Sequence, residues 1–164
     1  MFRYIQGGNS MKLKSKSFRD GEVMPVKFTC DGDGISPALF WEDVPEGTQS
    51  FVLIFDDPDA VSGTYDHWII YDIPKEIHSI QEGEVLNNAK IAKSSNHQNA
   101  YVAPCPPKGS GLHHYTFVLY ALDIEYLKPA SLERLEIEKA MKGHIITEAK
   151  LIVTYEKKKK FLFF

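Results

Sequence analysis

Three short segments of this chain concentrate polar residues that could do chemistry. They are Asp56-Asp57-Pro58-Asp59-Ala60, Asp66-His67-Trp68, and the stretch from Pro104 to Tyr115 that contains Cys105, His113 and His114. Imidazole and phenol groups donate hydrogen bonds to phosphate oxygens, and a protonated imidazole adds a positive charge. Gly109 and Gly111 let backbone approach a ligand closely, and Asp57 or Asp59 could meet an ammonium group. These residue types predict a small pocket for an anion or a zwitterion.

The order of the segments indicates how they could meet. If residues 51–57 and 67–73 form an antiparallel hairpin, Asp57 and His67 lie near each other, and an adjacent carboxylate can hold an imidazole tautomer. His113 and Tyr115 are two positions apart, so they share one face of a strand, whereas His114 points to the other face. The sequence therefore predicts a cluster at one end of a sheet.

Two enzymatic alternatives use the same residues. A metal-dependent hydrolase could bind its ion through Asp57, Asp59, His67 and His113. A cysteine-dependent hydrolase could use Cys105 as nucleophile, His113 as base and Asp57 to orient the base. Against the cysteine-dependent alternative, the chain has no Gly-x-Ser-x-Gly nucleophile elbow. Gly109-Ser110-Gly111 lacks the spacing of a phosphate-binding Walker loop.

Each segment also has a purely structural interpretation. Asp-Pro-Asp-Ala is a common turn, and His67 beside Trp68 could be a core histidine with satisfied hydrogen bonds. Pro106-Pro107 could be only a rigid loop, and Cys105 a small buried apolar residue.

The elements that must position these segments are mainly strands. Apolar runs at 51–55, 68–71 and 115–122 predict strands that are buried on both faces. Residues 11–18, 39–41 and 149–155 predict three more, the first an edge strand protected by its lysines. One helix is expected at 131–141, with Ser131 as its N-cap. The region 82–107 has weak periodicity and predicts a long functional or mobile loop.

Composition places the chain among ordinary globular proteins. It has 164 residues, 43% of them hydrophobic and 25% charged, which predicts one domain with a sizeable core. With 19 basic against 22 acidic residues the net charge is −3, so a general nucleic-acid-binding role is not expected. No run approaches the length of a membrane-spanning helix.

The two cysteines indicate a cellular compartment, and the two ends of the chain indicate the limits of the domain. Cys30 and Cys105 form no Cys-x-x-Cys pair, and together with the lack of a secretory signal in residues 1–10 they predict a cytoplasmic protein with reduced thiols. Residues 1–10 are expected to extend outside the domain, 11–155, and residues 156–164 to form a basic and aromatic tail. That tail is expected to be frayed, with contact to an anionic membrane surface as the alternative.

At the polar segments the sequence resembles the phosphatidylethanolamine-binding proteins, also called Raf kinase inhibitor-like proteins, and in particular their bacterial and archaeal branch. The resemblance runs from about Met11 to about Tyr155, with the motifs in the family's order. It is carried by the following segments: Asp57-Pro58-Asp59-Ala60, Asp66-His67-Trp68, Pro104-Cys105-Pro106-Pro107-Lys108-Gly109, His113-His114-Tyr115, Gly34 to Trp41, Val44 to Thr48 and Ala140 to His144.

The resemblance implies a mostly β fold, an antiparallel Greek-key β-sandwich with a few peripheral helices. It also implies a pocket for phosphate or phosphoethanolamine head groups at one end of the central sheet. Asp57 and His67 resemble one wall of that pocket, and His113 and Tyr115 the opposite wall. The residues Cys105, Pro106 and Pro107 resemble its rim, Tyr101 an aromatic at its mouth, and Asp59 an acid that supports the wall.

The chain departs from the family pattern at several positions. Val61 stands where the family usually has proline, and His114 where it usually has arginine. Residues 101–104 replace a loop with two glycines, so this loop is expected to be stiffer. The C-terminal helix of animal members is missing, which predicts a more open pocket.

These observations favour a non-catalytic binding protein with an anion pocket that regulates a partner such as a kinase or a serine protease, as an inhibitor or a signalling switch. No cofactor and no metal are expected. The resemblance also implies homodimers.

Overall fold

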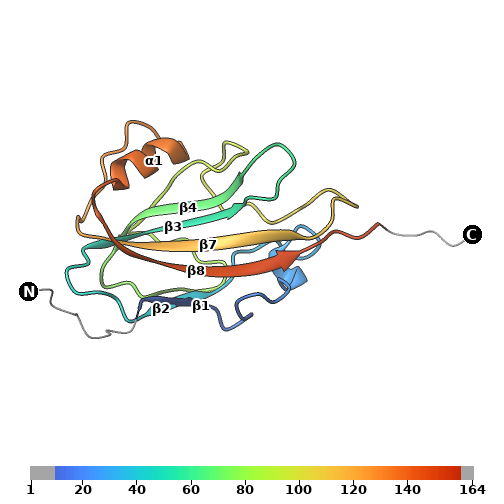
Figure 1. Ribbon diagram of the computed structural model, residues 1–164, viewed down its shortest axis with the longest axis horizontal. Helices are drawn as coiled ribbons and strands as arrows, with labels where there is room; N and C mark the ends of the chain where they lie inside the picture. The colour runs from blue at the N-terminus through green and yellow to red at the C-terminus, as the bar shows by residue number, and fades with distance from the viewer. Residues whose placement is uncertain (1–9, 160–164) are drawn as a thin grey trace, which may run out of the picture.

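The chain folds mostly into β-structure, as predicted. The computed structural model describes residues 10–159, and within them it has two antiparallel sheets, one α-helix, α1 (Arg134–Met141), and one short 3₁₀ helix, η1 (Val26–Phe28). The two sheets lie against each other, and α1 covers the opposite face of the larger sheet (Figure 1). The parts of the predicted extension and tail at residues 1–9 and 160–164 lie outside the described residues.

The larger sheet contains the strands that carry the candidate residues. Its order is β6 (Lys90–Ile91), β4 (Tyr65–Pro74), β3 (Ser50–Asp57), β7 (His113–Leu122) and β8 (Ile145–Tyr155). The connection between β4 and β7 carries the chain from one side of β3 to the other, and this gives the Greek-key arrangement. Because β3 is antiparallel to both neighbours, its end lies beside their beginnings.

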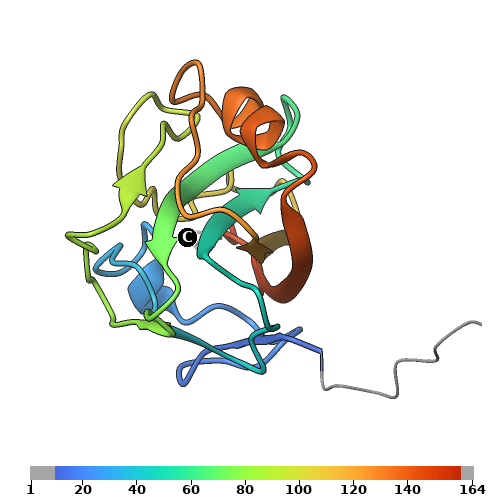
Figure 2. The same ribbon diagram turned by 90° about the vertical axis from the view of Figure 1, so that its left-hand side faces the viewer.

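Strand β3 is central because its side chains are buried on both faces. Phe51, Leu53 and Phe55 face the core between the two sheets. The alternate residues Val52 and Ile54 pack in a second core, together with residues of α1 and of the segment before it. The view along the sheet in Figure 2 shows α1 on one side of β3 and β4 and the small sheet on the other. The continuous apolar run of this strand thus reflects two cores, as its sequence predicted.

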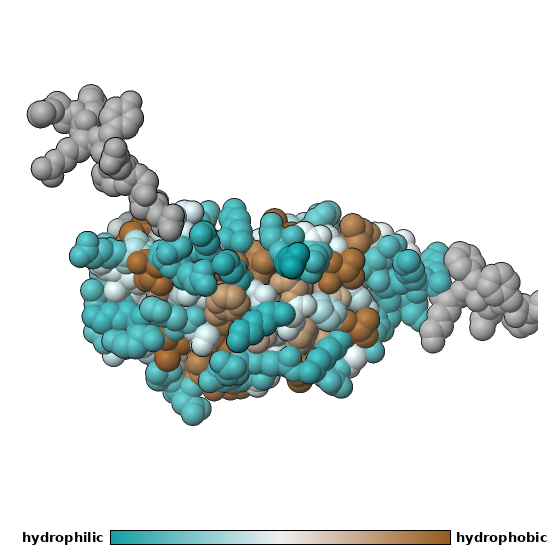
Figure 3. Space-filling view, turned by 90° about the horizontal axis from the view of Figure 1, so that it is seen from below, coloured by the Kyte–Doolittle hydropathy of each residue, from teal (hydrophilic) through white to brown (hydrophobic). Residues whose placement is uncertain are grey.

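The smaller sheet closes the first core. Its order is β1 (Lys12–Lys14), β2 (Leu39–Glu42) and β5 (Ser79–Ile80), so β1 is an edge strand as expected. Lys12 and Lys14 point outward and form ion pairs with Asp43 and Glu42, which makes this edge polar. In Figure 3 the face seen from below is mainly hydrophilic, with hydrophobic residues scattered over it.

The predicted N-cap of the helix is wrong. The helix begins after Glu133, and the side chain of Ser131 accepts a hydrogen bond from the Glu133 amide, 3.3 Å away, in the turn before the helix. Arg134, the first residue of α1, donates hydrogen bonds to Asp56 on β3 and Asp66 on β4, at 2.7 and 2.6 Å. The start of the helix is thus bonded to the sheet through Arg134, and it has no side-chain N-cap.

The expectation of reduced thiols is also wrong. Cys30 and Cys105 form a disulfide between loops 75 residues apart in sequence, with their Cα atoms 5.3 Å apart. The two loops meet because the Cys30 amide donates a hydrogen bond to the Pro104 carbonyl oxygen, 3.1 Å away, and no local sequence pattern reports such a long-range contact. Cys105 therefore has no thiol to act as a nucleophile, and the cysteine-dependent alternative is excluded for this oxidised form.

None of the helices within residues 10–159 has both the length and the apolar composition to cross a membrane. The cellular location of the protein stays a prediction.

Removal of the disulfide is expected to destabilise the fold. Closing a loop of this length restricts the unfolded chain, so Cys105→Ser should lower the free energy of unfolding by about 2–5 kcal/mol. Denaturant unfolding of the variant and of wild type, with and without a thiol reductant, measures this. The reductant should lower the free energy of unfolding of wild type only. The double variant Cys30→Ser/Cys105→Ser should have the same free energy of unfolding as the single variant. Two reactive thiols in unfolded wild-type protein without reductant would contradict the cross-link.

Candidate functional site

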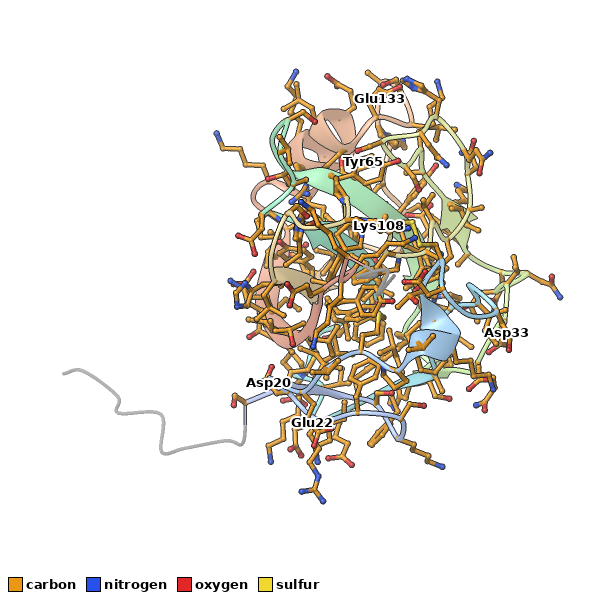
Figure 4. The ribbon with its side chains drawn as sticks, turned by 90° about the vertical axis from the view of Figure 1, so that its right-hand side faces the viewer. Asp20, Glu22, Asp33, Tyr65, Lys108 and Glu133 are labelled. Carbon is orange, nitrogen blue, oxygen red and sulfur yellow. A yellow bond between two sulfur atoms is a disulfide. The ribbon has the colours of Figure 1, made fainter. Side chains whose placement is uncertain are left out.

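The predicted cluster lies at the end of the larger sheet where β3 ends and β4 and β7 begin. Figure 4 looks at this end of the molecule, with Tyr65 and Lys108 labelled. Here the strand ends and the loop 101–107 enclose a cavity of about 300 Å³. Its wall consists of Asp57, Ala60, Val61, Ser62, Tyr65, His67, Val102, Ala103, Cys105, Pro106, Pro107, His113 and Tyr115. The structure thus brings together seven of the nine residues that the sequence singled out.

The pairing of Asp57 with a histidine differs from the sequence prediction. Asp57 lies opposite Tyr65 on β4, two residues before His67, and a register shift between Phe55 and Asp56 moves this pairing by one residue. The carboxylate of Asp57 instead accepts a hydrogen bond from Nδ1 of His113, 2.7 Å away. Both side chains of this pair are almost fully buried, 5% and 3% exposed.

Asp59 supports this pair from outside the cavity, as expected of it. Its backbone amide donates to the second carboxylate oxygen of Asp57, at 2.9 Å. Its own carboxylate accepts from the His114 amide and ring, both at 2.8 Å. These bonds lower the pKa of Asp59, the amide bond being the larger cause. His114 is exposed and faces away from His113 and Tyr115, which are buried.

His67 is held through one ring nitrogen. Its Nδ1 lies 2.7 Å from the Val102 carbonyl oxygen, which fixes the proton on Nδ1 in the neutral ring. Burial lowers the pKa of His67. The hydrogen bond to Val102 and the negative charges of Asp57 and Asp66 raise this pKa, but their effect is smaller. Its Nε2 has no hydrogen-bond partner within residues 10–159 and is not fully shielded from solvent, so this atom opens into the cavity.

The hydroxyl of Tyr115 belongs to the same cavity wall. It faces the carboxylate of Asp57, with which it makes a side-chain hydrogen bond. Burial, and then the negative charge of Asp57, raise the pKa of Tyr115. The hydroxyl therefore keeps its proton and is a donor at neutral pH.

The floor of the cavity is aromatic. The ring of Phe55 lies 5.5 Å from that of His67 and 6.1 Å from that of Tyr115, centroid to centroid. On its other sides it stacks on Phe117 at 3.9 Å and on Tyr101 at 5.8 Å. Such contacts hold the rings of the two polar residues at fixed angles.

Tyr101 does not lie at the mouth of the cavity, contrary to the expectation. It lies behind Phe55, where it borders a neighbouring apolar cavity, and its hydroxyl donates to the Phe28 carbonyl oxygen, 2.8 Å away. The wall also contains Ser62, Tyr65, Val102 and Ala103, which the sequence did not select as ligand-binding residues. The hairpin register could have suggested Tyr65, since it opposes Asp57, and the departure of residues 101–104 from the family pattern marked the loop that contributes Val102 and Ala103.

The rim is built as predicted, with an additional lysine. Cys105, Pro106 and Pro107 line one side. Behind the disulfide, Nζ of Lys157 lies 3.1 Å from a carboxylate oxygen of Asp31 and 3.7 Å from Sγ of Cys105. The Gly109 amide donates to the Lys157 carbonyl oxygen, 3.2 Å away. The first residues of the predicted tail are therefore attached to the rim loop.

The metal-dependent alternative has no site in residues 10–159, since no three His, Cys, Asp or Glu side chains there are grouped to hold an ion. Asp57 and His113 bond each other, and Asp59 bonds His114. The proposed ligands are thus committed to other partners.

Comparison with known proteins agrees with this arrangement. A family profile described as phosphatidylethanolamine-binding protein matches residues 14–156. A UPF0098 protein of Aquifex aeolicus is 44% identical over 159 residues, covering 94% of this chain and 93% of that protein.

Two solved structures have the same fold over nearly their whole length. A phosphatidylethanolamine-binding protein homologue from Chlamydia trachomatis is 37% identical, with a TM-score of 0.85, covering 92% of this chain and 99% of the other. The YbcL protein of Escherichia coli, described as a member of the mammalian PEBP family, is 26% identical, with a TM-score of 0.83 and coverage of 90% and 99%.

The Asp57–His113 pair is expected to matter for stability more than the neighbouring Asp59–His114 pair. Asp57→Ala leaves a buried imidazole without its partner, and such losses cost about 3–5 kcal/mol. Asp59→Ala removes an exposed partner of a histidine and should cost less than about 1 kcal/mol. Equilibrium unfolding of the two variants compares them directly, and equal losses would show that burial of the first pair has no energetic consequence.

Proposed function

Because the chain belongs to the phosphatidylethanolamine-binding protein family, we propose that its cavity binds a small phosphate-bearing ligand, either a free phosphate or a phosphoethanolamine-like head group. The observation that supports this proposal is that two polar side chains line the same cavity with their rings 5.4 Å apart, His67 with its unpartnered Nε2 and Tyr115 with its hydroxyl. A phosphate group has oxygens on several sides, so it can accept a hydrogen bond from both side chains at once.

The charges around the cavity favour an anion only when the imidazoles are protonated. An imidazolium at His113 neutralises the buried charge of Asp57, 2.7 Å away. His67 is largely neutral in the free protein, because burial lowers its pKa. Its Nε2 donates to an anion only after it takes up a proton, so anion binding and proton uptake at His67 are coupled.

A head group with an ammonium has a second partner within reach of the rim. Asp59 is 43% exposed and lies just outside the wall. Its carboxylate offers an acceptor for the ammonium of phosphoethanolamine, and this distinguishes that ligand from free phosphate.

We further propose that the ligand-bound pocket regulates a protein partner, of the kinase or serine protease class that the family resemblance implies. Homodimer formation and membrane contact through the basic tail also stay predictions. Binding of a small ligand is the proposal to test first, because regulation of a partner through the pocket depends on it.

Phosphate and then O-phosphoethanolamine are expected to shift the imidazole NMR signals of His67 and His113 together and to saturate. His67→Ala should abolish the saturable shift because it removes the donor, whereas His114→Ala, on the opposite face of β7, should bind phosphate as wild type does. Equal affinity of wild type and His67→Ala would exclude the proposed site. A stronger response to O-phosphoethanolamine that Asp59→Asn removes would identify the ammonium partner.

Sulfate binding is expected to strengthen as the pH falls. Sulfate carries no proton at these pH values, so it requires protonated His67. The affinity should therefore fall by about tenfold per pH unit as the pH rises from the lowered pKa of free His67 to its higher pKa in the complex. Calorimetric titration between about pH 5 and about pH 8 measures this. His114→Ala should keep the slope, and a constant affinity over this range would contradict the coupling.

A further inference from the structure

The most reactive arrangement in the molecule involves a serine that sequence reasoning did not select. The Oγ atom of Ser110 lies 2.9 Å from Nε2 of His113. The other ring nitrogen of His113, Nδ1, lies 2.7 Å from the carboxylate of Asp57. Hydroxyl, imidazole and carboxylate are thus joined in the order that activates a serine nucleophile, and such sites are recognised by geometry rather than by sequence order.

We propose that Ser110, His113 and Asp57 form a catalytic triad that hydrolyses small carboxylic esters. This activity goes beyond ligand binding, and it replaces the expectation of a non-catalytic protein. The excluded cysteine alternative assigned the nucleophile to Cys105, whereas this proposal assigns it to a different side chain with a direct contact to the base.

The carboxylate is fixed in the orientation that the base requires. Asp57 is 5% exposed on its side chain, and its second oxygen accepts the Asp59 amide at 2.9 Å. In the neutral ring of His113 the proton therefore lies on Nδ1, toward Asp57, which leaves Nε2 as the acceptor that faces Ser110. Asp57 positions the base and stabilises the imidazolium that forms when the base takes a proton.

Ser110 has a hydrogen bond available in both protonation states of the base. Its Oγ lies 2.7 Å from the Pro107 carbonyl oxygen as well as 2.9 Å from His113. With neutral His113 the hydroxyl donates to Nε2. With the imidazolium, Nε2 donates to Oγ and the hydroxyl donates to Pro107.

The serine is also presented to substrate. Ser110 is exposed, and it stands between Gly109 and Gly111, whose φ angles of 77° and 86° are in the left-handed region that glycine adopts without strain. Two of its partners, Pro107 and His113, line the cavity of about 300 Å³. Ser110 itself is not part of the cavity wall, so the ester would lie at the rim, with its carbonyl carbon at Ser110 and one of its groups directed toward the cavity.

Groups that can stabilise the developing oxyanion lie next to the nucleophile. The amide of Gly111, the residue after Ser110, has no hydrogen-bond partner within residues 10–159, and the amide at this position serves as an oxyanion donor in other serine hydrolases. The side chain of Lys159 passes over Gly109, the residue before Ser110, and brings a positive charge to this loop.

The reaction that follows from this geometry is a two-step acyl transfer. Oγ of Ser110 bonds to the ester carbonyl carbon while its proton moves to Nε2 of His113. The bond from carbon to the alcohol oxygen then breaks, and the alcohol leaves with the proton from Nε2. Water repeats the sequence on the acyl-serine, so one ester and one water give one acid and one alcohol, and the serine is restored.

A fluorophosphonate probe tests the nucleophile. It is expected to displace fluoride and to modify one residue, Ser110, as identified by the mass of the peptide that contains it. Ser110→Ala should not be labelled, and Ser79→Ala, which removes an exposed serine in β5, should be labelled at the wild-type rate. Absence of a label on Ser110 in folded wild-type protein overturns the proposal.

Hydrolysis of p-nitrophenyl acetate tests the whole triad. Ser110→Ala should lower kcat/KM at least about a hundredfold while keeping the wild-type NMR fingerprint of the folded chain. In wild type kcat/KM should fall at low pH because a protonated base accepts no proton, and Asp57→Asn should change this pH profile as well as the rate. If Ser110→Ala keeps the activity, the hydrolysis comes from other histidine or lysine side chains and Ser110 only caps the imidazole.

Discussion

The buried bond between Asp57 and His113 is the interaction on which the rest of the site depends. It joins the last residue of β3 to the first residue of β7. Taking a carboxylate out of water is costly unless its oxygens are bonded, and here both are, by the His113 ring and the Asp59 amide. The same two partners fix where the ring of His113 points. Its outer nitrogen is therefore presented to Ser110 and the cavity in one orientation, whichever chemistry the cavity performs.

The fold explains why this pair forms at one end of the sheet and not along it. The side chains of β3 are buried on both faces along its length, so polar groups are tolerated only where the strand reaches the surface. An antiparallel arrangement brings the starts of β4 and β7 to the same place, and with them His67 and Tyr115. Phe55, the last apolar residue of β3, packs against the rings of His67 and Tyr115. The core residue thereby restricts the movement of these two side chains in the cavity wall.

The sequence predicted those features that depend on local composition. Apolar runs located β3, β4 and β7, and the alternation of His113, His114 and Tyr115 correctly separated the two histidines between faces. Seven of the nine residues that the sequence singled out line the cavity, whereas Asp59 and Tyr101 do not. The histidine partner of Asp57 could not be derived, because it depends on the pairing of β3 with β7, two strands that are distant in the sequence. The disulfide and the contact of Ser110 with His113 depend on how loops fold back, and no periodic pattern encodes that.

The loop 101–104 shows how a substitution that appears to close a pocket can instead organise it. Val102 and Ala103 stand where the family pattern has flexible glycines, and both line the cavity. The Val102 amide donates to the His67 carbonyl oxygen at 2.8 Å, and the Val102 carbonyl oxygen accepts from the His67 ring at 2.7 Å. One residue thus bonds both the backbone and the side chain of His67. Just beyond it, the disulfide ties the same loop to Cys30. The Val102 bonds and the disulfide hold the loop in place, so Nε2 of His67 is directed into the cavity before any ligand binds. The entropy lost in ordering this loop is therefore lost on folding and not on ligand binding. The stiffness that the sequence predicted for this loop therefore favours an organised, open cavity over a closed one.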